Sequence, residues 1–129
     1  MIKRLDRLDV ATSDLADAAT IYQRNFGFAV RRAAPGDGPG AADDALVTVG
    51  DAEIRLRADA AAADFVAVNG EGLAALWLEA DDVDAVAAAL DRAGLAHRAV
   101  RREADRRILE VDPKAANMVA LFIFDRRPI

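Results

Sequence analysis

Apolar and polar residues alternate over Leu5–Thr12, which predicts a β-strand because successive side chains of a strand point to opposite faces. Leu8 and Val10 fall on one side of this stretch. Arg7 and Asp9 fall on the other side. The predicted strand therefore has one apolar face, suited to packing under a helix, and one charged face.

A helix is predicted over residues 15–26. Ser13 or Asp14 can serve as its N-cap, since a short side chain with an oxygen accepts hydrogen bonds from the first free backbone N–H groups. Gly27 then ends the helix in the usual C-terminal manner. The apolar residues between these signals recur at helical spacing: Leu15, Ala18, Ala19, Tyr22 and Phe26.

The rest of the first half reads as strands joined by turns. A loop rich in Pro and Gly covers residues 34–44, and Gly50 with Asp51 forms a tight turn. Residues 58–71 are weakly patterned, and we interpret them as the connection between two halves of the chain. The strands predicted around these features cover residues 28–32, 46–49 and 53–57.

The second half has the same order of elements. Asp81 or Asp82 caps a predicted helix that runs to about Ala93, and Gly94 ends it. A turn at 103–105 and another at 112–117 separate its later strands. The strands predicted in this half cover residues 75–80, 95–100, 107–111 and 118–124.

An internal repeat relates the two halves. At an offset of 68 residues the cap Asp14 meets the cap Asp82, and at an offset of 67 the stop Gly27 meets Gly94. We therefore predict one domain of two β-α-β-β-β modules. The first module covers about residues 1–58, a linker covers about 59–72, and the second module covers about 73–129.

Composition and charge limit the classes of partner. The formal net charge of −5 disfavours binding to nucleic acids or anionic membranes. The chain has no cysteine, which excludes disulfides, thiolate metal sites and cysteine nucleophiles. The longest strongly apolar run, Met118–Phe124, is far shorter than the roughly 20 residues that span a bilayer. Residues 1–7 do not form a secretory signal, so we predict a soluble cytoplasmic protein.

Three segments carry a resemblance to one known family. Residues 5–15 are similar to a Leu-Asp-His opening strand that ends in an Asp-Leu helix cap. Tyr22 through Phe28 is similar to a Tyr…Phe-Gly-Phe helix end. Residues 112–117 are similar to an Asp-Pro-Asp-Gly-Asn turn with one extra residue, and residues 78–83 fit a fifth strand that runs into the second helix. Together they resemble the vicinal-oxygen-chelate superfamily of glyoxalase, bleomycin-resistance and dioxygenase domains.

The resemblance implies an α+β fold in which two βαβββ modules form a curved mixed-sheet cup with the helices outside. It also implies that metal-dependent members place one metal ligand on each of four strands. The matching positions in this chain are Arg7, Arg55, Ala75 and Ala120. Guanidinium has no lone pair to donate at neutral pH and alanine has no donor atom, so we predict no metal and no cofactor.

Strand parity identifies the residues that would line the cup. Each of these residues is on the face of its strand that points away from the helices, opposite the apolar face. Arginines there could hold an anionic ligand, or could pair with the neighbouring carboxylates. Trp77 could stack on a planar ligand, fill the space left by small neighbours, or pack at a dimer interface. The predicted ligand-binding residues are Arg7, Asp9, Glu53, Arg55, Arg57, Trp77, Glu79, Met118 and Phe122.

Other candidate chemistry is weak. Glu79 could act as a general base if it is desolvated, while Asp81 and Asp82 are better explained as helix caps. His97 has no partner of a metal-ligating type, and we interpret it as an exposed surface residue. No catalytic triad, phosphate-binding loop or dinucleotide motif is present, so no catalytic residue is assigned.

The sequence therefore favours a metal-free protein that binds a small organic molecule, forms a homodimer and sequesters a drug or metabolite. A metal-independent enzyme of lyase or isomerase type, using the Arg and Glu residues of the cup, is the alternative. A non-catalytic interaction module is the third hypothesis. Metal-dependent glyoxalase or dioxygenase activity is not expected.

Overall fold

The computed structural model describes residues 1–34, 44–116 and 119–126. These residues divide into two compact units, each treated separately below. The first unit is Arg7–Ala74. The second unit is Met1–Asp6 together with Ala75–Ile129. Strand β1 (Ile2–Ala11) therefore contributes its first residues to the second unit and the rest to the first unit.

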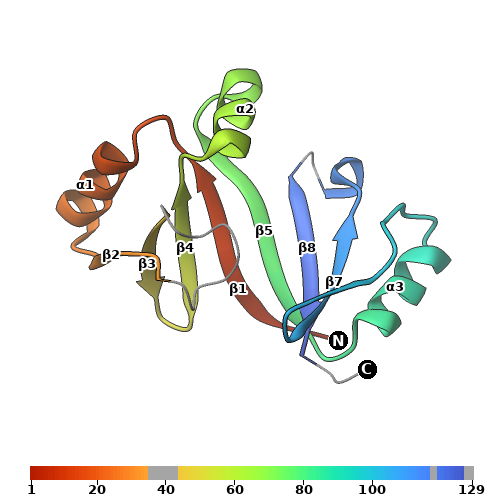
Figure 1. Cartoon of the computed structure of the whole chain (residues 1–129). Coiled ribbons are helices and arrows are strands. Elements are labelled where there is room, and N and C mark those ends of the chain that lie inside the picture. The colour runs from red at the N-terminus through yellow and green to blue at the C-terminus, as the bar shows by residue number, and fades with distance from the viewer. Residues whose placement is uncertain (35–43, 117–118, 127–129) are drawn as a thin grey trace. The chain divides into compact units, whose positions relative to one another are not determined.

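The first unit has a sheet in the order β2-β3-β4-β1. The central pair, β4 with β1, is parallel, and the two outer pairs are antiparallel. Helix α1 lies beside these strands and α2 follows β4 in the chain (Figure 1). The elements of this unit besides β1 are α1 (Leu15–Phe26), β2 (Val30–Arg32), β3 (Ala45–Val49), β4 (Ala52–Arg57) and α2 (Ala60–Asn69).

The second unit repeats this arrangement with the strand order β5-β8-β7-β6. Its parallel pair is β5 with β8, and the other two pairs are antiparallel. The predicted βαβββ repeat and the α+β fold class are therefore confirmed. The elements of this unit are β5 (Gly72–Ala80), α3 (Val83–Arg92), β6 (Arg101–Glu103), β7 (Arg106–Val111), the 3₁₀ helix η2 (Pro113–Ala116) and β8 (Ala120–Asp125).

The helix ends follow the predicted signals. The side chain of Asp14 accepts a hydrogen bond from the backbone N–H of Asp17, and Gly27 ends α1 with a left-handed φ of 70°. Asp82 caps α3 through the N–H of Asp84, while Gly94 follows its C-cap with φ 72°. No helix of the described residues is long and apolar enough to cross a membrane.

Strand parity is confirmed in both units. In the first unit, Val10, Ile54 and Leu56 pack with the apolar residues of α1. In the second unit, Leu78, Ile123 and other apolar residues pack with Val83 and Val86 of α3. In each unit, one apolar face of the sheet packs against the helix. The opposite face of the sheet is free to carry polar or aromatic side chains.

Two elements differ from the prediction. Residues 60–69 form α2. The sequence analysis missed this helix because its own apolar residues fall on all sides of it and leave no amphipathic period. Residues 95–100 were predicted as a strand, which is wrong. His97 makes only an isolated bridge to Val111, and the strand that pairs with β7 begins at Arg101.

Candidate functional site

Six charged residues of the first unit gather on the sheet face opposite α1, and we call this set the charged face. Strands β1 and β4 supply the predicted residues, while Asp44 lies directly before β3. Most of these side chains are buried, with Asp44 only 2% exposed and Asp9 only 4% exposed. The charged face consists of Arg7, Asp9, Asp44, Glu53, Arg55 and Arg57.

Opposite charges meet across and along the strands of the charged face. The parallel register sets Arg7 beside Glu53 and Asp9 beside Arg55. Along β1, Nε of Arg7 lies 2.8 Å from Oδ1 of Asp9. Along β4, Nη2 of Arg55 donates to Oε2 of Glu53 at 3.2 Å. The geometry therefore corresponds to the ion-pair alternative for these arginines, since a buried charge needs a partner.

Arg57 connects three carboxylates. Its Nη2 donates to Oδ2 of Asp59 at 2.7 Å, its Nε lies 3.6 Å from Oδ2 of Asp44, and its Nη1 lies 3.8 Å from Oδ2 of Asp9. Burial lowers the pKa of Arg57, but Asp44 and Asp59 outweigh burial and raise that pKa above its ordinary value. Arg57 therefore stays charged and holds these carboxylates in place.

The pKa values of Asp44 and Asp59 shift in opposite directions, although Arg57 lowers both. Burial raises the pKa of Asp44 above its ordinary value, and Arg57 and Arg55 offset only part of that rise. Burial also acts on Asp59, but hydrogen bonds from the N–H of Ala62 and from Arg57 lower its pKa overall. Asp44 thus accepts a proton more readily than Asp59.

An aromatic cluster occupies the matching face of the second unit. Trp77 and Phe122 are register partners on β5 and β8, and their rings stack 4.4 Å apart at 15°. The guanidinium of Arg106 lies 5.1 Å from the ring centroids of both Trp77 and Phe124. We call Trp77, Phe122, Phe124 and Arg106 the aromatic face.

Trp77 is packed on both sides within this cluster. It is only 7% exposed and belongs to a buried group with Ala75, Ile108 and Phe124. Such packing favours the alternative in which the indole fills the space left by small neighbours.

Glu79 is engaged by arginines. Its Oε1 accepts a hydrogen bond from Nε of Arg4 at 2.9 Å, and its Oε2 lies 3.8 Å from Nη1 of Arg126. Arg4 also donates to Oδ1 of Asp6 at 2.7 Å. Each oxygen of the Glu79 carboxylate therefore lies beside a cation. The arrangement around Glu79 favours a structural ion pair over a general base.

The model of the Glyoxalase/Bleomycin resistance protein/Dioxygenase superfamily matches residues 4–112. The chain belongs to this superfamily. The predicted resemblance is confirmed, and the matched range includes both the charged face and Trp77. The comparison with curated proteins found no match.

Solved structures of methylmalonyl-CoA epimerases share the fold of this superfamily member. The Mycobacterium tuberculosis epimerase has a TM-score of 0.72 and 26% identity, covering 98% of this chain and 90% of that chain. The Streptomyces coelicolor epimerase in complex with 2-nitronate-propionyl-CoA has a TM-score of 0.72 and 24% identity, covering 100% and 98%. A methylmalonyl-CoA epimerase in complex with methylmalonyl-CoA and NH4+ gives the same TM-score, identity and coverage.

The four positions that the family resemblance assigns to metal ligands do not fit a metal ion. Arg7 and Arg55 are buried and paired with Asp9 and Glu53. Ala75 and Ala120 are register partners on β5 and β8 and carry no donor atom. Within residues 1–34, 44–116 and 119–126, no group of three or more His, Asp or Glu side chains could hold a metal ion.

The predicted site residues thus fall into two sets. Five lie together on the charged face: Arg7, Asp9, Glu53, Arg55 and Arg57. Trp77 and Phe122 stack on the aromatic face, and Glu79 shares their strand face. Met118 lies outside the described residues.

Sequence reasoning missed Asp44 and Arg106. Asp44 falls in the predicted loop. It lies two residues before Leu46, the register partner of Arg55, so the alternation of side chains could have placed it on the charged face. Arg106 carries no signal in the sequence, but its side chain is only 16% exposed and its guanidinium lies 5.1 Å from the centroids of two rings. No local pattern marks a cation that covers rings from other strands.

Proposed function

We propose that this superfamily member binds a small organic molecule and needs no metal ion to do so. The observation that carries the proposal is the chemistry of the four positions described above: two paired guanidinium groups and two alanines. A divalent ion would find no ligand there, whereas an organic molecule can use hydrogen bonds and apolar contact. Sequestration of a drug or metabolite is the role we propose for such binding.

The arginines of the charged face support an acidic ligand. Each guanidinium presents a planar fork of donors that matches a carboxylate. A ligand carboxylate would have to displace Glu53 from Arg55 or Asp9 from Arg7. Glu53, whose side chain is 24% exposed, can turn toward solvent more easily than Asp9, whose side chain is 5% exposed. Methylmalonyl-CoA is the first probe, because it combines a free carboxylate with an acyl thioester and is bound by an epimerase of the same fold.

The test measures binding with and without metal. The protein is treated with a chelator and titrated with methylmalonyl-CoA and a panel of organic acids, using calorimetry and the fluorescence of Trp77, the single tryptophan. We expect saturable binding that added Zn²⁺ or Co²⁺ leaves unchanged. Stoichiometric metal that survives purification and is required for binding would contradict the proposal.

A matched pair of variants assigns the binding to the charged face. Arg55→Lys keeps the positive charge beside Glu53 but loses the two-pronged geometry, so we expect about tenfold weaker binding. Arg24→Gln, on the exposed side of α1, should bind like the parent protein. Circular dichroism establishes that both variants are folded. If Arg55→Lys and Arg24→Gln bound the ligand with equal affinity, the ligand would not bind at the charged face.

A metal-independent enzyme is the second candidate, and Asp44 is the observation that favours it. A buried carboxylate whose pKa is raised can act as a general base and accept the proton that leaves a substrate carbon. The measurement is exchange of the Cα proton of methylmalonyl-CoA with D₂O, followed by NMR. The binding proposal predicts no exchange. Exchange that Asp44→Asn abolishes without loss of affinity would establish the enzyme instead.

The predicted homodimer and the interaction-module hypothesis have their own measurements. Sedimentation velocity gives the mass of the protein in solution, and we expect that of a dimer. A flat response to every compound in the panel would favour an interaction module over a binding protein.

A further inference from the structure

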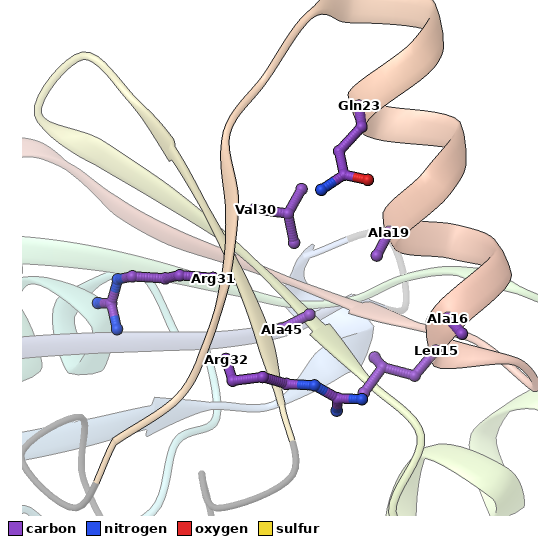
Figure 2. Close-up of a pocket in the computed structure, with 8 residues that line it drawn as sticks. All are labelled: Leu15, Ala16, Ala19, Gln23, Val30, Arg31, Arg32 and Ala45. Carbon is purple, nitrogen blue, oxygen red and sulfur yellow. The ribbon is translucent and has the colours of Figure 1, made fainter.

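A pocket on the helix side of the first unit lies apart from the charged face. It has a volume of about 180 Å³ and opens between α1 and the strands β2 and β3 (Figure 2). Because Ala45 and Val30 pack on the α1 side, the pocket lies on the opposite side of the sheet from Arg55 and Asp9. Its lining residues are Leu15, Ala16, Ala19, Gln23, Val30, Arg31, Arg32 and Ala45.

Small side chains explain why space remains here. Helix α1 contributes Ala16 and Ala19 to the lining, and β3 contributes Ala45, so three methyl groups meet where longer chains could fill the gap. None of the residues of α1 is fully buried. The gap opens to the surface, so a small molecule can enter it and contact this apolar lining.

The two arginines of β2 point to opposite sides. Val30 and Arg32 are register partners of Val47 and Ala45, whose side chains face α1, whereas Arg31 pairs with Leu46. The guanidinium of Arg31 accordingly extends away from the pocket, 3.9 Å from Oε1 of Glu53 (Figure 2). Arg32 therefore supplies the positive charge on the pocket side.

The lining defines the chemistry of the ligand. Leu15, Ala19 and Val30 give an apolar wall, the amide of Gln23 points into the space, and none of the lining residues that the structure describes is acidic (Figure 2). A volume of about 180 Å³ suits a short chain only. We propose that this pocket binds a short-chain aliphatic carboxylate, with its carboxylate on Arg32 and its chain on the apolar wall.

The test is a titration of ¹⁵N-labelled protein with butyrate, followed by amide NMR shifts. We expect saturable shifts at Ala16, Ala19, Val30 and Ala45 with a Kd of about 1 mM, because so small a ligand has few atoms with which to bind. Butyramide, which has the same shape without the charge, should bind more weakly. Shifts confined to Arg7, Asp9 and Arg55 would assign butyrate to the charged face and overturn the proposal.

Matched variants complete the test. Arg32→Gln should weaken butyrate binding about tenfold through loss of one charge-assisted interaction. Arg24→Gln, an exposed arginine of α1 that does not line the pocket, should bind like the parent protein. Ala19→Leu should fill the pocket and abolish the shifts while the circular dichroism spectrum is retained. The proposal is overturned if Arg32→Gln and Arg24→Gln bind butyrate equally, or if butyramide binds as well as butyrate.

Discussion

The charged face and the aromatic face occupy equivalent places in the two modules but have opposite chemistry. Each lies on the parallel strand pair of its unit, on the side away from the helix. Where the first unit sets Asp9 beside Arg55, the second sets Trp77 beside Phe122. The helix-facing sides of both sheets are apolar. The fold therefore constrains one side of each sheet and leaves the other side for function.

The two faces also differ in what they contribute to stability. Buried aromatic rings stabilise a fold through area removed from water and through ring contacts. Buried ion pairs contribute little net free energy, because desolvation offsets most of the attraction between the charges. We expect the aromatic face to stabilise its unit and the charged face to be close to neutral, and four measurements test this difference.

Phe124→Ala should have the largest effect. Phe124 is fully buried on the aromatic face, so its truncation should lower the free energy of unfolding by about 4 kcal/mol. Urea denaturation measures the loss. Phe26→Ala is the control, since that ring is 63% exposed and should cost no more than about 0.5 kcal/mol. Equal losses in the two variants would contradict the assignment of Phe124 to the core.

Asp9 tests the charged face through a double-mutant cycle with Arg7. Asp9→Ala leaves the buried guanidinium of Arg7 without its carboxylate and should cost about 3 kcal/mol. Replacing both residues, as Arg7→Met with Asp9→Leu, should restore stability to within about 1 kcal/mol of the parent. A double variant as unstable as Asp9→Ala would mean that the pair contributes substantial net stability.

Asp44 and Asp59 should give opposite dependence on pH. Because the folded pKa of Asp44 lies above its ordinary 3.8, stability falls as pH rises from 3.8 through the folded pKa. Asp44→Asn should therefore stabilise the protein at pH 7 and lose that advantage near pH 3. The folded pKa of Asp59 is lowered, so Asp59→Asn should destabilise the protein at pH 7 and less at low pH. Both changes should be smaller than those above, and equal signs at pH 7 would contradict them.

His97 should give the smallest effect, in the second unit. Its Nδ1 lies 2.7 Å from the carbonyl oxygen of Arg98 and its Nε2 lies 2.8 Å from Oδ1 of Asp91. The Arg98 carbonyl and Asp91 raise its pKa above the ordinary 6.5. This stabilisation is present below pH 6.5 and is lost as pH rises through the folded pKa. His97→Gln should be less stable than the parent at pH 5.5 and nearly equal at pH 9.

The same histidine shows where prediction from sequence failed. His97 was expected to be exposed, but it is half-buried, with both ring nitrogens next to acceptors. Asp91 lies six residues away, and no pattern indicates which carboxylate a lone histidine will meet. Helix α2 was missed for a different reason: its sequence is mostly apolar and has no amphipathic period, although Asp59 before it is a usable N-cap.

The sequence by itself determined the repeat, the helix caps, the strand parity and the family. These depend on spacing over a few residues, which local backbone geometry fixes. Only the tertiary structure decided which carboxylate each arginine contacts, that Asp44 lies beside Arg57, and that Arg106 covers Trp77. The contacts of Arg57 with Asp44 and of Arg106 with Trp77 join residues far apart in the chain. The energies of all these contacts depend on burial, which emerges only when the strands assemble.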